Sequence, residues 1–262
     1  MKSIRVLGVV NVTADSFSDG GQFLDANRAI EHGLRLRDDG ADFLDIGGES
    51  TRPGATPVSL EDEMRRVMPV VEALVAKGAR VSVDTSKPEV MRAAIDAGCA
   101  MVNDVNAFRA EGAIDAVAKA DGVELVAMHM KGTPRTMQED PRYDDVVAEV
   151  GAFLVERALA LEKAGVSRSR IVLDPGFGFG KTVEHNKQLL RSLPQLAALG
   201  YPVLAGLSRK KMLGDFTGRP ANERTAASVA AALIAVQNGA SLVRVHDVRE
   251  TVDAINVWLA LR

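Results

Sequence analysis

The sequence predicts an α/β protein: a single (β/α)8 TIM barrel domain over residues 1–262, with its active site at the C-terminal ends of the strands. Eight short apolar runs alternate with segments of helical periodicity, and strict alternation of this kind implies a parallel sheet. Each run ends in polar residues, which a closed barrel would gather on one face. The length of 262 residues also fits, because such a barrel needs about 250.

The predicted strands are rich in Val, Ile and Leu, which is typical of parallel strands that are buried on both faces. Eight units of strand and helix favour closure into a barrel over an open doubly wound sheet. The predicted strands are 4–10, 43–46, 81–84, 101–105, 124–128, 171–173, 203–207 and 242–245.

The intervening segments carry apolar residues at helical spacing, for example in 60–75, 146–164 and 226–236. Ser59-x-x-Asp62 resembles a capping box, and Ser86 is an N-cap candidate with Pro88 near the first turn. Glycine is expected where a helix stops before the next strand, because it adopts left-handed conformations readily. Those glycines are Gly40, Gly98, Gly165, Gly200 and Gly239.

Two long stretches without regular periodicity follow the first and second strands, at 13–23 and 47–58. Both are rich in Gly, Ser, Thr and Asp. Long loops within a compact domain are often functional or mobile. We therefore expect both loops to close over the site.

The composition excludes several functional classes. The net charge is −3 and no basic stripe is present, so no nucleic-acid partner is expected. The one cysteine, Cys99, cannot build a disulfide framework or a Cys-based zinc site, and its apolar neighbours predict burial. There is no cleavable signal pattern and no apolar stretch long enough to span a membrane. We expect a soluble, cytoplasmic protein without a membrane partner.

Polar residues at the strand ends are the candidate site. Asp84 and Asn103 end neighbouring strands, and they offer carboxylate acceptors beside an amide that both donates and accepts. Together they suit the mixed donor and acceptor edge of a pyrimidine-like ring; the alternative for each is capping of its local turn. The eight strand ends are Asn11, Asp45, Asp84, Asn103, His129, Asp174, Ser208 and His246.

The segment 174–181, with sequence DPGFGFGK, is the most conspicuous motif. Lys181 after Gly180 suggests a nucleotide phosphate loop, but Pro175 stands where that motif requires glycine. Two interpretations remain for this segment. It is a tight strand-to-helix turn, or Asp174 accepts hydrogen bonds from the N–H groups of a heterocycle.

Several cations cluster near the last strand ends and suit an anion such as a phosphate. Arg244 and His246 point the same way because side chains alternate along a strand. Lys210 and Lys211 follow the seventh strand, and Arg52 lies in the second long loop. A solvated charge run is the alternative for these cations. The other histidines are His32 and His185, expected at the surface, and His129, which has no assigned role.

A protein-only metal site is not expected, because histidines and carboxylates do not cluster in the sequence. Asn11 is the oxygen donor best placed to help hold Mg²⁺ on a bound phosphate. We see no Ser–His–Asp signature, no dinucleotide fingerprint and no nucleophile–base pair.

The motifs together resemble the dihydropteroate synthase family, in the family's order and over nearly the whole chain. The matching segments are 8–13 (GVVNVT), 15–21 (DSFSDGG), 45–54 (DIGGESTRPG), 82–87 (SVDTSK), 102–105 (VNDV), 174–181 (DPGFGFGK), 206–210 (GLSRK) and 244–247 (RVHD). The resemblance implies a (β/α)8 barrel that condenses (7,8-dihydropterin-6-yl)methyl diphosphate with 4-aminobenzoate. The products are 7,8-dihydropteroate and diphosphate.

The resemblance also implies roles for individual residues. Mg²⁺ would lie near Asn11, and the protein would be a homodimer. Asp45 would position the second long loop. The pterin would be bound by Asp84, Asn103, Asp174, Lys210 and Arg244. The diphosphate would be bound by Asn11, Arg52, Arg244 and His246. The 4-aminobenzoate would be bordered by Thr51, Pro53, Phe179 and Lys211.

Catalysis would rest on Asp84, Arg52 and His246. Diphosphate departure before amine attack would leave a resonance-stabilised cation, which Asp84 would stabilise while cations and Mg²⁺ stabilise the leaving group. An aniline nitrogen is already nucleophilic, which fits the lack of an obvious activating base. Loop closure would exclude water that would otherwise capture the cation.

Two residues depart from the family pattern: Ala14 stands where many members have Pro, and Lys211 where many have Ser. We expect altered affinity rather than lost activity. Two other functions are compatible with the scaffold, namely a non-catalytic pterin-binding paralogue and a pterin-dependent methyltransferase barrel. The STRP loop at 50–53 and the Arg244-x-His246 strand end argue against the methyltransferase, which has no diphosphate to anchor.

Overall fold

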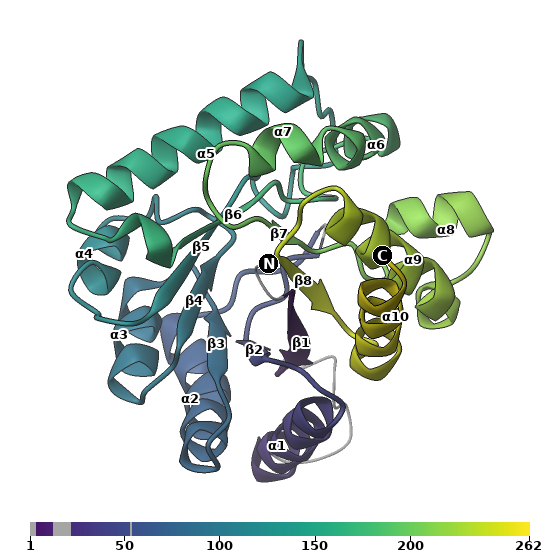
Figure 1. The fold of residues 1–262 in the computed structure, drawn as a ribbon. Helices are drawn as coiled ribbons and strands as arrows, with labels where there is room; N and C mark the ends of the chain where they lie inside the picture. Colours follow the sequence, from purple (N-terminus) through teal and green to yellow (C-terminus); the bar gives the residue numbers. More distant parts are fainter. Residues whose placement is uncertain (1–3, 13–21, 53) are drawn as a thin grey trace.

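The structure is a computed structural model that describes residues 4–12, 22–52 and 54–262, with the backbone alone for residues 22–25. Eight parallel strands stand at the centre of a ring of helices (Figure 1). The strands are β1 (Arg5–Asn11), β2 (Phe43–Gly47), β3 (Val81–Asp84), β4 (Met101–Asp104), β5 (Glu124–Met128), β6 (Ile171–Asp174), β7 (Leu204–Ala205) and β8 (Leu242–Val245).

The sheet closes on itself, which confirms the predicted TIM barrel. Its strand order is β6-β5-β4-β3-β2-β1-β8-β7, so that β1 pairs with both β2 and β8. An isolated bridge between Leu173 and Val203 joins β6 to β7 and completes the ring. All strand ends consequently meet at one face.

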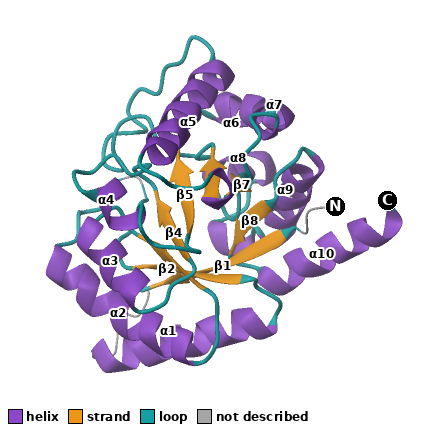
Figure 2. Cartoon of the chain, turned by 60° about the vertical axis from the view of Figure 1, so that its left-hand side comes forward, coloured by secondary structure: helices purple, strands orange, loops and turns teal. Residues whose placement is uncertain are grey.

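Helices form the outer layer, as the view in Figure 2 also shows. They cover the outward faces of the strands, whose own hydrogen bonds are satisfied within the sheet. The helices are α1 (Gln22–Asp38), α2 (Leu60–Ala76), α3 (Pro88–Asp96), α4 (Ala113–Val117), α5 (Val146–Lys163), α6 (Val183–Arg191), α7 (Leu193–Ala197), α8 (Lys211–Thr217), α9 (Thr225–Gln237) and α10 (Val248–Leu261).

Most predicted boundaries agree with the structure within two residues, and two details differ. The predicted strand 203–207 shortens to β7, because the chain turns just beyond it, where the Lys210 amide bonds the carbonyl of Leu207. Pro88 begins α3 as predicted, but the N-cap is Lys87, and the Ser86 hydroxyl donates to Asp104 instead. The predicted glycine stops are confirmed, with φ between +84° and +102°. They are Gly40, Gly98, Gly165, Gly200 and Gly239.

Ser59 caps α2 as predicted. Its side chain accepts from the Asp62 amide at 3.1 Å and donates to the Asp62 carboxylate at 2.8 Å. The Asp62 side chain therefore bonds the cap hydroxyl rather than the cap amide of a full capping box. This contact fixes the start of α2 directly after the second long loop.

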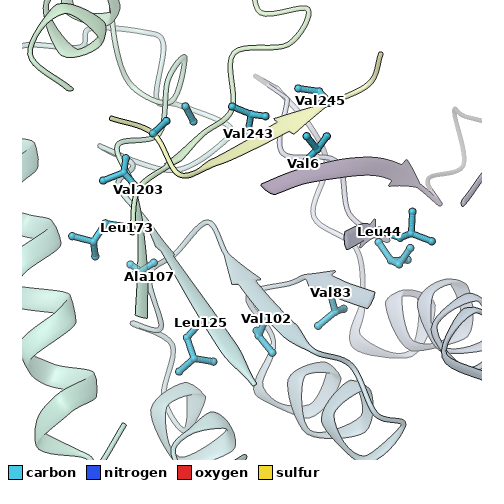
Figure 3. Close-up of a cluster of buried hydrophobic side chains, with 14 of the residues drawn as sticks. Val6, Leu44, Val83, Val102, Ala107, Leu125, Leu173, Val203, Val243 and Val245 are labelled. Atoms are coloured by element: carbon cyan, nitrogen blue, oxygen red, sulfur yellow. The ribbon is translucent and has the colours of Figure 1, made fainter. Parts of the chain in front are cut away.

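Alternating side chains divide the core into two layers. Outward-facing residues such as Val6, Val83 and Leu125 pack against the helices, and Figure 3 shows them around the sheet. Cys99 is buried in this layer, as predicted. The inward-facing residues fill the barrel below its polar end and form a separate cluster of Leu7, Phe43, Met101, Val126, Val172, Leu204 and Leu242.

No helix in the described part of the chain is both long and apolar enough to cross a bilayer.

Candidate active site

The polar strand ends form a floor at the C-terminal mouth of the barrel, directly above the inward-facing apolar cluster. Register places Asp84 opposite Asn103 and Asp174 opposite Met128. The predicted proximity of Asp84 and Asn103 is therefore confirmed. Asp45 lies two residues before Gly47 and faces the same way, into the barrel. Gly47 is paired with Asp84.

An ion network joins three of the strands across this floor. The Arg244 guanidinium donates to Asp45 through Nε at 2.5 Å and to Asp84 through Nη2 at 2.9 Å. Asp45 is fully buried and also accepts from the Ser82 hydroxyl at 2.6 Å. These bonds give Asp45 a role that the sequence did not suggest, since it anchors the floor rather than the second long loop.

Two buried carboxylates share this one guanidinium, so Arg244 alone does not match the charge of both in their ionised forms. Burial raises the pKa of Asp84 to about 7; Arg244 opposes the rise, and the nearby Asp45 carboxylate adds to it. The same carboxylates hold the pKa of Arg244 above its usual value, although burial alone would lower it. A ligand that brings N–H donors or positive charge would relieve this imbalance.

Asn103 presents an acceptor without a partner. Its Nδ2 donates to Asp45 at 3.4 Å, and this contact assigns the orientation of the amide. The Oδ1 atom is then buried with no hydrogen-bond partner among the described residues. An orphaned buried acceptor of this kind costs about 1–3 kcal/mol, which an N–H donor on a ligand would recover.

Asp174 ends β6 and supports the glycine-rich turn that follows it. Its carboxylate accepts from the Gly176 amide at 2.7 Å, and burial raises its pKa to about 6. Gly176 has φ of +66°, and a Cβ there would lie 1.9 Å from the His129 carbonyl oxygen. Any other residue would therefore push the turn away from the strand end.

Phe179 and Lys210 form one wall beside the floor. The Lys210 ammonium lies 4.1 Å from the centroid of the Phe179 ring, within range of a cation–π interaction. Burial lowers the pKa of Lys210 to about 8, and Arg244 lowers it further while Asp174 opposes. The wall therefore combines an aromatic face with a cation close to the carboxylates of the floor.

His246 follows β8, next to the end of β7, and is neutral near pH 7. Burial lowers its pKa to about 3, with Arg244 and Arg209 adding to the effect. Its Nδ1 is 3.0 Å from the Ser208 hydroxyl, which also accepts from the His246 amide at 3.2 Å. The imidazole can thus offer a hydrogen bond to an anion, but not a charge.

A pocket beside His246 continues toward α1 and contains residues that the sequence did not indicate. His32 was expected at the surface, but burial lowers its pKa and it lines this pocket. The mixed charges of the α1 sequence did not indicate that one face of this helix lines the mouth of the barrel. The pocket is lined by Val9, Asn11, Arg28, Glu31, His32, Arg35 and His246.

The side chains around Asn11 determine whether the predicted Mg²⁺ site is chemically suitable. In the described part of the chain, no three His, Cys, Asp or Glu side chains converge as a metal site would require. Asn11 lines the same pocket as two arginines, which suits a phosphate-bound ion rather than an ion held by protein alone. The residues are compatible with Mg²⁺ that arrives with a diphosphate.

The remaining predicted residues lie at the rim and make few contacts with the floor. Thr51 is half-buried and Arg52 is exposed in the second long loop, whose base is held where the Arg66 guanidinium donates to the Gly48 carbonyl at 3.1 Å. Lys211 is 86% exposed and pairs with Asp215 at 2.8 Å. Pro53, Ala14 and most of the loop 13–23 lie outside the described residues.

The profile of a family described as pterin binding enzyme matches residues 7–246. The chain therefore belongs to this family. The dihydropteroate synthase of Escherichia coli (strain K12) is 46% identical over 254 residues, covering 97% of this chain and 90% of that protein.

Two solved structures extend the comparison. Dihydropteroate synthase of Xanthomonas albilineans with 4-aminobenzoic acid has a TM-score of 0.93 and 59% identity, covering 99% of this chain and 93% of that chain. Its complex with 7,8-dihydropteroate has a TM-score of 0.90 and 56% identity, covering 99% and 94%. Within the family, the chain belongs with the dihydropteroate synthases, which are transferases.

Proposed function

We propose that this chain condenses (7,8-dihydropterin-6-yl)methyl diphosphate with 4-aminobenzoate, and that diphosphate departs before the amine attacks. The methylene C–O bond breaks and its electron pair leaves with the diphosphate. The aniline nitrogen then forms the C–N bond and gives up one proton, so that 7,8-dihydropteroate results. A relative of this chain has been solved with this product bound.

The charge on the floor is the observation that carries the proposal. Asp45 and Asp84 share the Arg244 guanidinium, and their carboxylates lie beside the unpaired Asn103 acceptor. The N–H edge of a pterin would satisfy these acceptors. A cation that develops on the pterin methylene would be stabilised by the Asp84 carboxylate, since fixed charges in a dry site need no reorganisation.

The other predicted pterin ligands complete the ring pocket. Asp174 accepts hydrogen bonds from the ring, Lys210 donates to it, and Arg244 stacks on it. The Lys210 ammonium lies beside the negative floor, which supports a ligand that presents both donors and acceptors.

The leaving group would be held by Asn11, Arg52, Arg244 and the neutral His246. Mg²⁺, when bound, would neutralise diphosphate charge, and Asn11 is the residue that would help hold it. The arginines of the α1 pocket supply further positive charge on the same side. The amine then attacks from the 4-aminobenzoate site, which the family resemblance assigns to Thr51, Pro53, Phe179 and Lys211.

Two further statements belong to this proposal. The chain functions in the cytoplasm, where folate-type synthesis takes place, and it forms a homodimer. Both are supported by the family resemblance. Sedimentation of the purified protein tests the dimer, and a monomer at all concentrations would contradict it.

Diphosphate release measured with and without 4-aminobenzoate tests the activity. We expect release that depends on 4-aminobenzoate and matches dihydropteroate formation. A protein that binds the pterin but never releases diphosphate would be a non-catalytic paralogue. A methyltransferase barrel would instead bind methylated folate with no requirement for the diphosphate.

Isotope exchange tests the order of bond changes. Substrate with ¹⁸O in the bridging C–O–P position is incubated with enzyme without 4-aminobenzoate. Departure before attack predicts that the label scrambles into non-bridging positions while the substrate persists. Complete retention of the bridging label during turnover would contradict it.

A further inference from the structure

The lysine that ends the glycine-rich motif is buried inside the protein. Lys181 is 3% exposed, and its Nζ donates to the carbonyl oxygens of Gly176 and Phe179, each at 3.0 Å. It also donates to the His129 carbonyl at 3.3 Å, and it lies 2.9 Å from His129 Nδ1. The ammonium therefore ties the turn after β6 to the end of β5.

The two buried titratable groups fit one protonation pattern. Burial lowers the pKa of His129 to about 3, and the neighbouring Lys181 lowers it further, so the imidazole is neutral and its Nδ1 lone pair accepts. Burial lowers the pKa of Lys181 to about 7, although Asp174 opposes this. The four groups around Lys181 Nζ, three carbonyls and an imidazole, are all acceptors, so they require a protonated donor at Nζ.

This geometry removes Lys181 from ligand binding. A lysine that grips a phosphate must present its ammonium to the site, whereas the protons of Lys181 are directed at protein acceptors. His129 is fixed in turn, since its ring packs edge-on against Phe153 with centroids 4.9 Å apart and its amide bonds the Asp174 carbonyl at 2.9 Å.

Other contacts hold the turn from outside. The Tyr143 hydroxyl donates to the Gly180 carbonyl at 2.8 Å, and the Gly178 amide donates to Asn186 at 2.8 Å. Lys181 differs from both, because it binds the turn from within and at two points, the carbonyls of Gly176 and of Phe179 itself. Its loss would leave the Phe179 and His129 carbonyls without their donor, and the Gly176 carbonyl would keep only the Phe179 amide.

We propose that Lys181 and His129 are positioning residues for 4-aminobenzoate: they clamp the turn 175–180 so that Phe179 faces Lys210. This inference rests on the proposed function, in which Phe179 borders the 4-aminobenzoate. The pterin floor depends less on the clamp, because the backbone of Asp174 is held by its register with Met128 in the sheet, and only its carboxylate reaches the turn, at the Gly176 amide. The clamp thus acts mainly on 4-aminobenzoate.

Four variants test the clamp. Lys181→Met keeps the aliphatic stem without the donor, and His129→Phe keeps the ring packing without Nδ1. Phe179→Leu reports on the subsite itself. Tyr143→Phe is the matched control, since it removes one outer hydrogen bond to the same turn. KM for 4-aminobenzoate, calorimetric Kd for the pterin diphosphate and amide exchange in 175–181 are measured for each.

We expect Lys181→Met to raise KM for 4-aminobenzoate about tenfold or more and to speed amide exchange in the turn. Its pterin Kd should stay within about threefold of wild type. His129→Phe should also raise KM for 4-aminobenzoate without a matching change in the pterin Kd. The rise should be smaller, because three carbonyls still accept from the Lys181 ammonium. Tyr143→Phe should change neither constant by more than about threefold.

The outcomes distinguish the clamp by Lys181 and His129 from the assignment of Phe179 to the 4-aminobenzoate site. If Phe179→Leu raises KM and Lys181→Met does not, or if Lys181→Met weakens both substrates equally, the clamp is overturned. If Phe179→Leu leaves KM unchanged, the 4-aminobenzoate assignment fails, and amide exchange alone then decides the clamp. Should Lys181→Met fail to fold, His129→Phe decides: a selective rise in KM supports the clamp, and unchanged KM overturns it.

Discussion

The floor of the site and its rim are built in different ways. On the floor, Asp45, Asp84 and Arg244 come from β2, β3 and β8 and are joined by short hydrogen bonds in a buried network. At the rim, Arg52 is exposed in a loop, and Lys211 is 86% exposed in a surface pair with Asp215. The floor is complete before any ligand arrives, whereas the rim must be completed around the substrates.

This difference assigns different tasks to the two regions. A preorganised network is suited to recognise a ring and stabilise charge without moving. Residues on loops are suited to close over a bound substrate and exclude water. Variants of the floor should therefore change stability and pterin affinity together, while variants of the rim should change turnover more than pterin affinity and leave stability nearly unchanged.

Arg244→Met should have the largest effect. It leaves Asp45 and Asp84 buried without their shared cation, and breaking a buried pair in this way costs about 3–5 kcal/mol. Chemical denaturation measures the free energy of unfolding, and a pterin titration should find no saturable binding. A loss below about 1 kcal/mol would mean that the floor network does not contribute to the fold.

Asp45→Ala should have a smaller effect, because Arg244 keeps its bond to Asp84. We expect pterin binding to weaken by about 1–3 kcal/mol, since Asn103 and Arg244 lose a common anchor. Asp104→Ala is the control: Asp104 is also fully buried, but it lies on the outward side of β4 and accepts from Ser86 and from the Phe108 amide. Equal loss of pterin affinity in both variants would contradict a specific role for Asp45.

His246→Gln tests the electrostatics of the mouth through pH. The pKa of His246 falls to about 3 on folding, so the unfolded chain takes up a proton below its ordinary value near 6.5 while the folded chain does not. Wild-type stability is therefore lost as pH falls, and the variant lacks this loss. Between pH 6.5 and 5, the free energy of unfolding of the wild type should fall relative to that of the variant by on the order of 2 kcal/mol. Parallel curves from pH 8 to 5 would contradict a neutral buried imidazole.

Much of the floor could be predicted because it follows from the barrel. The alternation of apolar runs and helices requires parallel strands, and consecutive strands put Asp84 beside Asn103. The strand ends thus predicted which residues lie together on the floor, and their contact with a ring stays a prediction. The family resemblance supplied the substrates, which no local pattern contains.

Contacts between distant segments could not be predicted. The partner of Asp45 is Arg244, 199 residues later, and the two meet only because β1 and β8 close the ring. The sequence assigned no role to Lys181, and the left-handed turns at the motif's glycines bring carbonyl oxygens around its ammonium. His32 lines the pocket through the packing of α1, which its helical spacing did not reveal.

One calorimetric comparison tests the division between floor and rim most directly. The pterin diphosphate is titrated into wild type, Asn103→Ala and Arg52→Met without 4-aminobenzoate, and turnover is measured in parallel. We expect Asn103→Ala to weaken binding by about 1–3 kcal/mol. Arg52→Met should stay within about 0.5 kcal/mol of wild-type stability, because surface substitutions rarely exceed that. Its turnover should fall at least about tenfold, and this loss should exceed its loss of affinity for the pterin diphosphate. Unchanged pterin affinity in Asn103→Ala, or wild-type turnover in Arg52→Met, would contradict the division.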